Sequence, residues 1–268
     1  MVQEARHDAW QAADSYDRYM GRWSRQVASL FLDWLDVDEG VDWLEVGCGT
    51  GALSAAILAQ RNPRSLIAVD QSQAFVSAAT AGVDDPRAVF QVGDAQSLDL
   101  ATASRDAIVS ALVLNFVPDK VRALAEMKRV ARRGATIGIY VWDYPGDGLG
   151  FVRAFWDAAA ALDPRASEFA ENRRFSFCTP EGMSELFVSA GLAAPVCRAI
   201  EIPTVFQNFD DFWRPFTLGA GPAPGYCASL SEDRLRQLSE RLRETLPRND
   251  GGAIPLKARA WALRTTID

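Results

Sequence analysis

The chain has 268 residues, 49% of them apolar, so it can bury a sizeable core as one enlarged domain or a domain with a cap. Its formal charge of −7 argues against the basic surface that most nucleic-acid-binding proteins carry, although a local basic groove stays compatible with it. Residues 1–10 are polar where a signal peptide would be apolar, and no apolar run approaches the roughly 18 residues of a membrane span, so we expect a soluble, cytoplasmic protein that binds neither membrane nor nucleic acid.

Residues 9–35 place apolar and aromatic side chains at helical spacing. Within this stretch, residues 15–24 interleave aromatic residues with arginines, and Gly21 would weaken or break a helix there. We predict N-terminal helices over residues 1–40, with the segment 15–24 as a lid over a ligand. His7 is the only histidine of the chain, and its place near the N-terminus indicates a solvent-facing side chain rather than a catalytic one.

The clearest motif is W-L-E-V-G-C-G-T-G-A at residues 43–52, a short apolar strand that runs into three alternate glycines. Leu44 and Val46 suit a buried strand, and the glycines let the backbone turn and meet a ligand with no Cβ in the way. Apolar residues from Leu53 onward recur at helical spacing, so the loop opens a helix whose first N–H groups face outward. The alternative is a glycine turn that binds no ligand. Three glycines at alternate positions favour a ligand-binding loop over this alternative.

Strands and helices alternate after this loop. The predicted elements are strand Ser65–Asp70, helix Ser72–Ala81, strand Ala88–Val92, strand Asp106–Ala111, a helix that begins near Pro118 and ends at Gly134, and strand Ala135–Val141. Strands separated by helices cannot form hairpins, so we expect right-handed crossovers and a parallel, doubly wound sheet over residues 41–145. The ligand of such a sheet lies beyond the carboxyl ends of its strands.

The alternation loosens beyond Trp142. The predicted elements there are helix Leu149–Leu162, a helix that begins after Thr179 and ends at Gly191, strand Val196–Phe206, helix Ser231–Leu246 and strand Ile254–Ile267. No internal repeat or low-complexity linker marks a second domain. We therefore interpret residues 145–178 and 207–252 as cap insertions, with residues 146–268 completing the same domain.

Two ligand classes fit the glycine loop. Read as G-x-G-x-x-A, with Gly47, Gly49 and Ala52, it is a dinucleotide fingerprint, in which a pyrophosphate lies on the helix N-terminus. Asp70 closes the second strand, where a carboxylate accepts hydrogen bonds from both ribose hydroxyls of an adenosine, and that fits NAD as well. The first hypothesis is thus a nicotinamide-dependent oxidoreductase, although such an enzyme has no general need for Asp94 after the third strand.

Read as E-V-G-C-G-T-G, residues 45–51 resemble the first motif of the class I S-adenosylmethionine-dependent methyltransferases. Gly93-Asp94-Ala95, residues 110–116 and residues 129–134 resemble later motifs of this family in the same order. The resemblance implies an α/β fold, Rossmann-like and doubly wound, with a mostly parallel seven-stranded sheet and helical cap insertions. The cofactor site that it implies consists of Glu45, Gly47, Cys48, Gly49, Gly51, Asp70, Gln71, Asp94, Ala95 and Leu112.

The resemblance also implies an N-terminal lid. Arg22 with Tyr16 or Tyr19 is our hypothesis for the group that holds the methionine carboxylate of S-adenosylmethionine. A surface arginine on an ordinary helix is the alternative.

The sequence departs from the family pattern at two places. Asn115 stands where many members that act on small molecules have a histidine, and Arg133-Gly134 replaces the usual Pro-Gly-Gly turn. Without a histidine base, catalysis relies mainly on in-line positioning and desolvation if the acceptor is already deprotonated. A carbon or alcohol acceptor needs a base, and Asp143 and Tyr144 are the candidates, with support of the fold as the alternative.

The acceptor is expected to be a small molecule, methylated at oxygen, nitrogen or carbon. The acidic charge supports this, as does the lack of the adjacent prolines that enzymes methylating nucleic-acid amino groups carry. The cysteines lack the paired spacing of a zinc site, so we expect no metal. A catalytically silent cofactor-binding protein is the remaining alternative. Six aromatic residues of the insertions could line an acceptor pocket or form the core of the cap: Phe155, Trp156, Phe212, Trp213, Phe216 and Tyr226.

Overall fold

The structure is a computed structural model that describes residues 17–146, 148–218 and 221–268. The chain divides into two compact units. The described part of unit 1 comprises residues 17–23, 144–176 and 201–259, apart from residues 147, 219 and 220. Unit 2 comprises residues 24–143, 177–200 and 260–268.

The strands form a seven-stranded sheet in the order β3-β2-β1-β4-β5-β7-β6. Their bounds are β1 Asp42–Val46, β2 Ser65–Asp70, β3 Ala88–Val92, β4 Arg105–Ala111, β5 Ala131–Trp142, β6 Val196–Phe206 and β7 Ile254–Thr266. The pairs β1–β2, β1–β4, β2–β3 and β4–β5 are parallel, and β5–β7 is antiparallel. This order and these directions confirm the predicted Rossmann-like, mostly parallel sheet.

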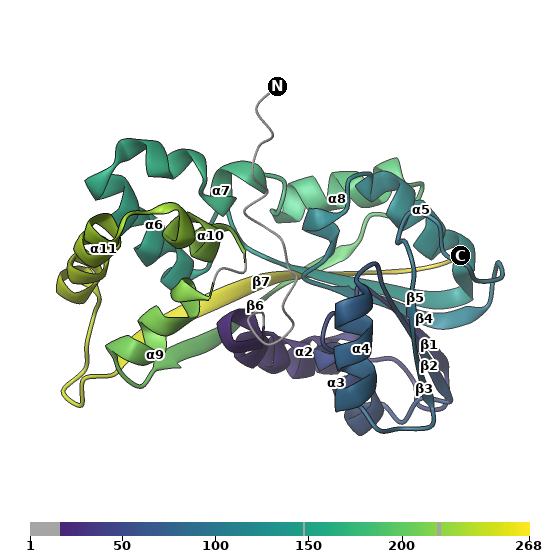
Figure 1. Ribbon diagram of the computed structural model, residues 1–268. Coiled ribbons are helices and arrows are strands. Elements are labelled where there is room, and N and C mark those ends of the chain that lie inside the picture. Colours follow the sequence, from purple (N-terminus) through teal and green to yellow (C-terminus); the bar gives the residue numbers. More distant parts are fainter. Residues whose placement is uncertain (1–16, 147, 219–220) are drawn as a thin grey trace. The chain divides into compact units, whose positions relative to one another are not determined.

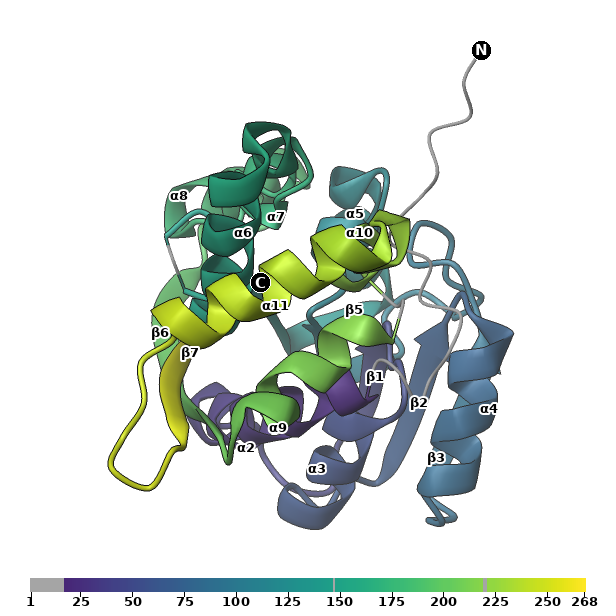
Figure 2. The ribbon, with the colours of Figure 1, turned by 60° about the vertical axis from the view of Figure 1, so that its left-hand side comes forward.

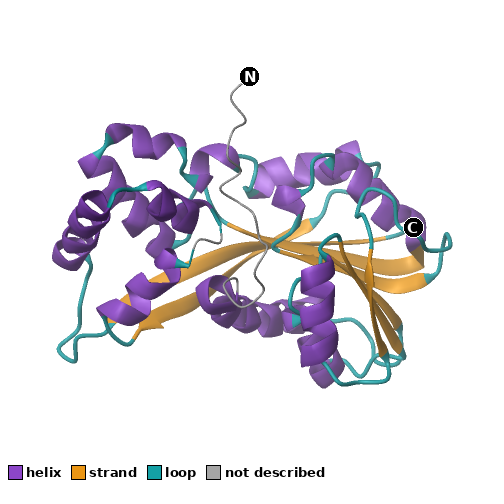
Figure 3. Ribbon diagram, viewed as in Figure 1, coloured by secondary structure: helices purple, strands orange, loops and turns teal. Residues whose placement is uncertain are grey.

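Helices cover both faces of the sheet in unit 2. Figures 1 and 3 show α2 (Arg22–Leu35), α3 (Ala52–Gln60) and α4 (Gln73–Gly82) on one face, and α5 (Lys120–Val130) and α8 (Pro180–Ser189) on the other. Sheets covered on both faces need apolar strands, and β1 is accordingly buried from Trp43 to Val46 and β4 from Ala107 to Ser110. The 3₁₀ turn η2 (Leu114–Phe116) follows β4.

Side-chain caps fix where three of these helices begin. Ser72, Asp119 and Thr179 each accept a hydrogen bond from a backbone N–H of the first helical turn of α4, α5 and α8, respectively. The caps at Ser72 and Thr179 agree with the helix starts predicted from the sequence.

The predicted boundary between α5 and β5 was wrong. The helix ends at Val130 and the strand begins at once at Ala131, so Gly134 lies within β5 and does not end the helix. The pairing with β4 shifts between Arg105 and Ala107, which face Ala131 and Thr136, so the residues between bulge out. Gly134 accommodates this bulge with φ +80°, and its N–H donates to the carbonyl of Ile267 at 2.7 Å.

The described residues of unit 1 are mainly helical. They form η1 (a π-helix, Asp17–Gly21), α6 (Gly150–Leu162), η3 (Pro164–Glu168), α7 (Glu171–Arg174), α9 (Phe209–Trp213), η4 (Arg214–Thr217), α10 (Pro222–Ser229) and α11 (Glu232–Thr245). Within this unit, α11 packs beside α6 (Figure 2). The change from π-helix to α-helix falls at Gly21, where the sequence predicts a weak point.

Aromatic rings make the core of unit 1. Phe155 stacks on Phe216 with ring centroids 4.7 Å apart, and Phe212 lies 5.3 Å from Phe216. All three side chains are buried. These phenylalanines pack on one another in the core of the unit, and their place in the wall of an acceptor pocket stays a prediction.

Candidate cofactor and active site

The glycine loop joins β1 to α3 through left-handed backbone. Gly47, Gly49 and Gly51 have φ values of +82°, +52° and +86°, a region that side chains other than glycine rarely adopt. The N–H groups of Gly47 and Cys48 both donate to the carbonyl of Val69 on β2, at 2.7 and 3.0 Å. The loop is therefore tied to the carboxyl end of the neighbouring strand.

Two glycines of the loop serve different purposes. A Cβ on Gly47 would lie 2.4 Å from Cγ2 of Val113, so the segment after β4 packs directly on the loop backbone at this point. A Cβ on Gly49 would meet no atom within 4 Å. Gly47 is therefore required by the packing of the protein itself, whereas Gly49 leaves room for a ligand.

Asp70 at the end of β2 holds the loop and the next helix. Its Oδ2 accepts from the N–H of Gly49 and its Oδ1 from the N–H of Ser72, each at 2.9 Å. Burial raises the pKa of this carboxyl, and the two backbone hydrogen bonds oppose that rise. Each carboxylate oxygen retains further acceptor capacity, which suits two adjacent ribose hydroxyls.

Glu45 lies beneath the loop. Its carboxyl is buried and accepts a hydrogen bond from Oγ of Ser54 on α3. Burial raises the pKa of Glu45 to about 8, so the group is largely uncharged at neutral pH. The side chain links β1 to α3 from inside, and its predicted contact with the cofactor stays a prediction. Ser54 was not predicted as a site residue. The signal that could have identified it is a single hydroxyl residue in a mainly apolar helix.

β2 and β3 are parallel neighbours, so the residues that follow them lie at the same edge of the sheet, the one formed by the carboxyl ends of the strands. The strands are parallel with Asp70 opposite Val92, so Gln71 and Asp94 follow neighbouring strand ends. Asp94 is exposed, and its Oδ1 accepts from the backbone N–H of Gln96 at 2.8 Å. The hydrogen bonds from Gln96 lower the pKa of Asp94, so it stays an ionised acceptor beside the half-buried Ala95.

The exit of β4 carries strain and unsatisfied polar groups. Leu112 is buried and has φ +60°, which is rare for a leucine and typical of a functional position. Asn115 is 4% exposed, and neither its Nδ2 nor its Oδ1 has a hydrogen-bond partner among the described residues. Buried polar atoms are almost always satisfied, so this amide calls for a ligand. Together with the open space at Gly49, it shows that this edge of unit 2 fits a polar cofactor.

The other predicted site residues lie apart from this group in the chain. Asp143 is buried at the end of β5 in unit 2, and its charge adds to the burial that raises the pKa of Cys178. Tyr144 belongs to unit 1, where its ring lies 4.9 Å from that of Phe175. Tyr16 lies outside the described residues.

Arg22 has a partner of its own within unit 1. Its Nη1 donates to Oδ1 of Asp211 at 2.8 Å, and its guanidinium lies over the rings of Trp23 and Phe206, 4.4 and 4.6 Å from their centroids. These contacts account for the arginine as a structural residue. Its predicted contact with a methionine carboxylate stays a prediction.

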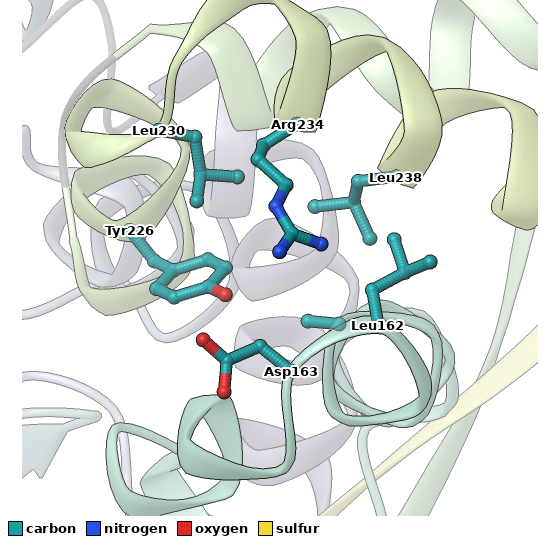
Figure 4. Close-up of a pocket in the computed structure, with 7 residues that line it drawn as sticks. Leu162, Asp163, Tyr226, Leu230, Arg234 and Leu238 are labelled. Atoms are coloured by element: carbon teal, nitrogen blue, oxygen red, sulfur yellow. The ribbon is translucent and has the colours of Figure 1, made fainter.

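A pocket in unit 1 is too small for an organic acceptor. Figure 4 shows the side chains of Asp163, Tyr226 and Arg234 converging on it, the first from the residue between α6 and η3 and the others from α10 and α11. Its volume is about 40 Å³, room for a few water molecules. The other lining residues are Ala159, Leu162, Leu230 and Leu238.

The comparisons with known proteins decide the family. The family described as "Methyltransferase domain" matches residues 44–139, which run from β1 into β5. The demethylmenaquinone methyltransferase of Roseiflexus sp. (strain RS-1) is 32% identical over 166 residues, 59% of this chain and 70% of that protein. The chain belongs to the class I S-adenosylmethionine-dependent methyltransferases. The methyltransferase thus uses S-adenosylmethionine as methyl donor, and the oxidoreductase and silent-protein hypotheses are not retained.

Two further similarities agree with this assignment. The malonyl-[acyl-carrier protein] O-methyltransferase of Hahella chejuensis is 32% identical to this methyltransferase over 126 residues, 47% of this chain and 45% of that protein. The crystal structure of a methyltransferase from Bacillus halodurans, 12% identical, superposes with a TM-score of 0.59 over 90% of this chain and 98% of that one, which supports the fold alone. Among the described residues of the methyltransferase, no helix combines the length and the apolarity needed to cross a bilayer.

Replacing Asp70 with alanine is expected to weaken binding of S-adenosylhomocysteine by about tenfold to 100-fold. The loss follows because the N–H of Gly49 in the loop and the N–H of Ser72 at the start of α4 lose their acceptor, each hydrogen bond to a charged group being worth about 1.5–3 kcal/mol. Calorimetric titration measures the change. Asp99→Ala, at an exposed carboxylate of the same unit, is the matched control and should bind as the wild type does; equal affinities for both variants would contradict the assigned role.

Proposed function

We propose that this methyltransferase transfers the methyl group to a small molecule that carries an aromatic ring, with unit 2 binding the donor and unit 1 the acceptor. The observation that carries the proposal is the presence, in one chain, of an intact donor loop and a second unit built around aromatic rings. Aromatic side chains stack readily on aromatic ligands. The name of the Roseiflexus relative gives a quinone as its substrate, which supports this class.

The residues of unit 2 would bind the cofactor from its adenosine end to its methionine end. Asp70 would accept hydrogen bonds from the two ribose hydroxyls, and Asp94 from the adenine amino group, with the N–H of Ala95 toward the ring. Gln71 would lie at the rim of this site. Leu112 and the unsatisfied amide of Asn115 would lie against the methionine end.

When bound, S-adenosylmethionine supplies a methyl group on a sulfonium, an electrophile strong enough that the protein need only position the acceptor and exclude water. The amide of Asn115 can both donate and accept a hydrogen bond, which suits orientation rather than proton transfer. Asp143 and Tyr144 remain the candidate proton acceptors for an acceptor that must lose a proton.

The test has two parts. Calorimetric titration should show binding of S-adenosylhomocysteine and none of NAD. Transfer of labelled methyl groups should then be measured with 1,4-naphthohydroquinone, a simple phenol and a malonyl thioester. Label in the aromatic compounds is the expected result, whereas label only in the malonyl thioester would contradict an aromatic acceptor, and failure of S-adenosylhomocysteine to bind would contradict the cofactor site.

A further inference from the structure

A carboxyl group and a phenol are buried in the aromatic core of unit 1. Glu171 begins α7 and is 5% exposed, and Nε1 of Trp156 on α6 donates to its Oε2. Tyr19 on η1 is 4% exposed. A glutamate this deeply buried is rare in proteins unless it is paired or functional, since burial of a carboxyl disfavours its charged form.

A run of ring contacts connects the two groups. The ring of Tyr19 lies 5.4 Å from that of Phe216 in an edge-on arrangement, and Phe216 stacks on Phe155 at 4.7 Å. Phe155 in turn lies 5.0 Å from Trp156, the hydrogen-bond donor to Glu171. The polar groups at both ends of this run are therefore set among aromatic rings.

The phenol of Tyr19 is left unsatisfied. Its hydroxyl is buried and has no hydrogen-bond partner within the part of the chain that the structure describes. Buried hydroxyls nearly always have a partner, so a ligand group is the natural candidate for this one. The carboxylate of Glu171 is near enough for its charge to contribute to the raised pKa of Tyr19, together with burial as the main cause.

We propose that Tyr19 and Glu171 bind the hydroxyl group of an aromatic acceptor. The Tyr19 hydroxyl donates to the acceptor oxygen, and the Glu171 carboxylate accepts the hydrogen of the acceptor hydroxyl. Both hydrogen bonds fit a phenol or hydroquinone, because a hydroxyl is at once donor and acceptor. A carboxylate in the same place would be repelled by Glu171, so the pair selects hydroxyl-bearing aromatic compounds. This inference rests on the proposed function and deepens it.

The selectivity should depend on pH. Burial raises the pKa of Glu171 to about 7, and the positive charge of Arg174 opposes the rise. The other titratable groups that face the pair are Tyr144 and Cys227, whose charges would raise the pKa of Tyr19 further. Because only the ionised carboxylate is a full acceptor, preference for the hydroxyl compound should increase as the pH rises through about 7.

Two probes of similar size test the proposal. 1-Naphthol has the hydroxyl, and 1-fluoronaphthalene has the same rings without a hydrogen-bond donor. At pH 8 we expect the wild type to bind 1-naphthol at least about tenfold more tightly, and Glu171→Gln and Tyr19→Phe each to lose most of this ratio. Glu168→Gln, an exposed glutamate on the preceding η3, is the matched control and should keep the ratio.

The affinity for S-adenosylhomocysteine separates this inference from the proposed function. It should be the same in the wild type, Glu171→Gln and Glu168→Gln, which also shows that these proteins are folded; Tyr19→Phe is left out of this comparison because Tyr19 is itself a predicted contact of the cofactor. A wild type that binds both naphthalenes equally, or binds 1-naphthol not at all at millimolar concentration, would overturn the inference while leaving cofactor binding intact. Retention of the full ratio in Tyr19→Phe, which removes a single oxygen, would overturn it as well.

Discussion

Gly47→Ala is expected to lower the free energy of unfolding by about 2–5 kcal/mol and the affinity for S-adenosylhomocysteine by about 100-fold or more. The φ of +82° costs an L-residue about 1–2 kcal/mol. The added Cβ would stand 2.4 Å from Cγ2 of Val113, and relief of such overpacking costs about 1–3 kcal/mol more. Because the loop and the segment after β4 must separate to admit this methyl group, the cofactor site is distorted. Urea unfolding and calorimetric titration measure the two effects.

Gly134→Ala is the matched control for backbone strain. Gly134 has a similar φ of +80° in the same unit, and a Cβ there would meet nothing within 4 Å. The Gly134→Ala variant should lose only the part of the free energy of unfolding that the left-handed backbone costs, and it should bind S-adenosylhomocysteine as the wild type does. The double variant Gly47→Ala, Val113→Ala should recover part of both losses, since the two side chains would be in contact. Equal losses in Gly47→Ala and Gly134→Ala would refute the close approach as the cause.

Glu45→Gln is expected to become progressively more stable, relative to the wild type, as the pH rises from 5 to 8. Burial raises the pKa of Glu45 from its ordinary 4.5 to about 8. Between these values the folded protein keeps a proton that the unfolded chain has released, so the free energy of unfolding falls with rising pH and levels off above about 8. The whole effect is on the order of 5 kcal/mol. Glutamine keeps an acceptor for Ser54 and does not titrate, so the variant should lack this part of the fall.

Urea unfolding at several pH values tests this expectation, with Glu126→Gln as the control. The hydrogen bonds from Arg129 lower the pKa of Glu126. The stability that this carboxylate gives the folded protein is therefore constant above the ordinary pKa of glutamate and is lost only at more acid pH. The difference between Glu126→Gln and the wild type should therefore not change between pH 5 and 8. A pH-independent difference for Glu45→Gln as well would show that the carboxyl is ionised in the folded protein.

Local patterns were enough to predict several elements of the fold. The strand Val196–Phe206 was predicted with the bounds that β6 has, and in the structure its burial alternates residue by residue from Ile200 to Phe206. The caps at Ser72 and Thr179 likewise depend on neighbouring residues only. The glycine motif predicted a turn after the strand, and the structure has this turn, built from left-handed backbone.

Features that depend on distant contacts were not predictable in this way. The bulge of β5 arises because its pairing with β4 shifts, and its one local signal, Gly134, was interpreted as the end of the preceding helix. Glu171 lies in a charged stretch that reads as surface, and only its contact with Trp156 identifies it as buried. The aromatic residues of the insertions could equally form a core or a pocket wall, because both require the same composition.

The division of the chain into units also bears on how such enzymes diversify. Beyond the N-terminal segment, unit 1 consists of two stretches, 144–176 and 201–259, each bounded on both sides by residues of unit 2. A gene can therefore exchange these two stretches with those of a homologue and leave the glycine loop, Asp70 and Asp94 untouched. Under the proposed division of labour, new acceptors would be acquired by recombination at four junctions, while the machinery for the methyl donor is inherited unchanged.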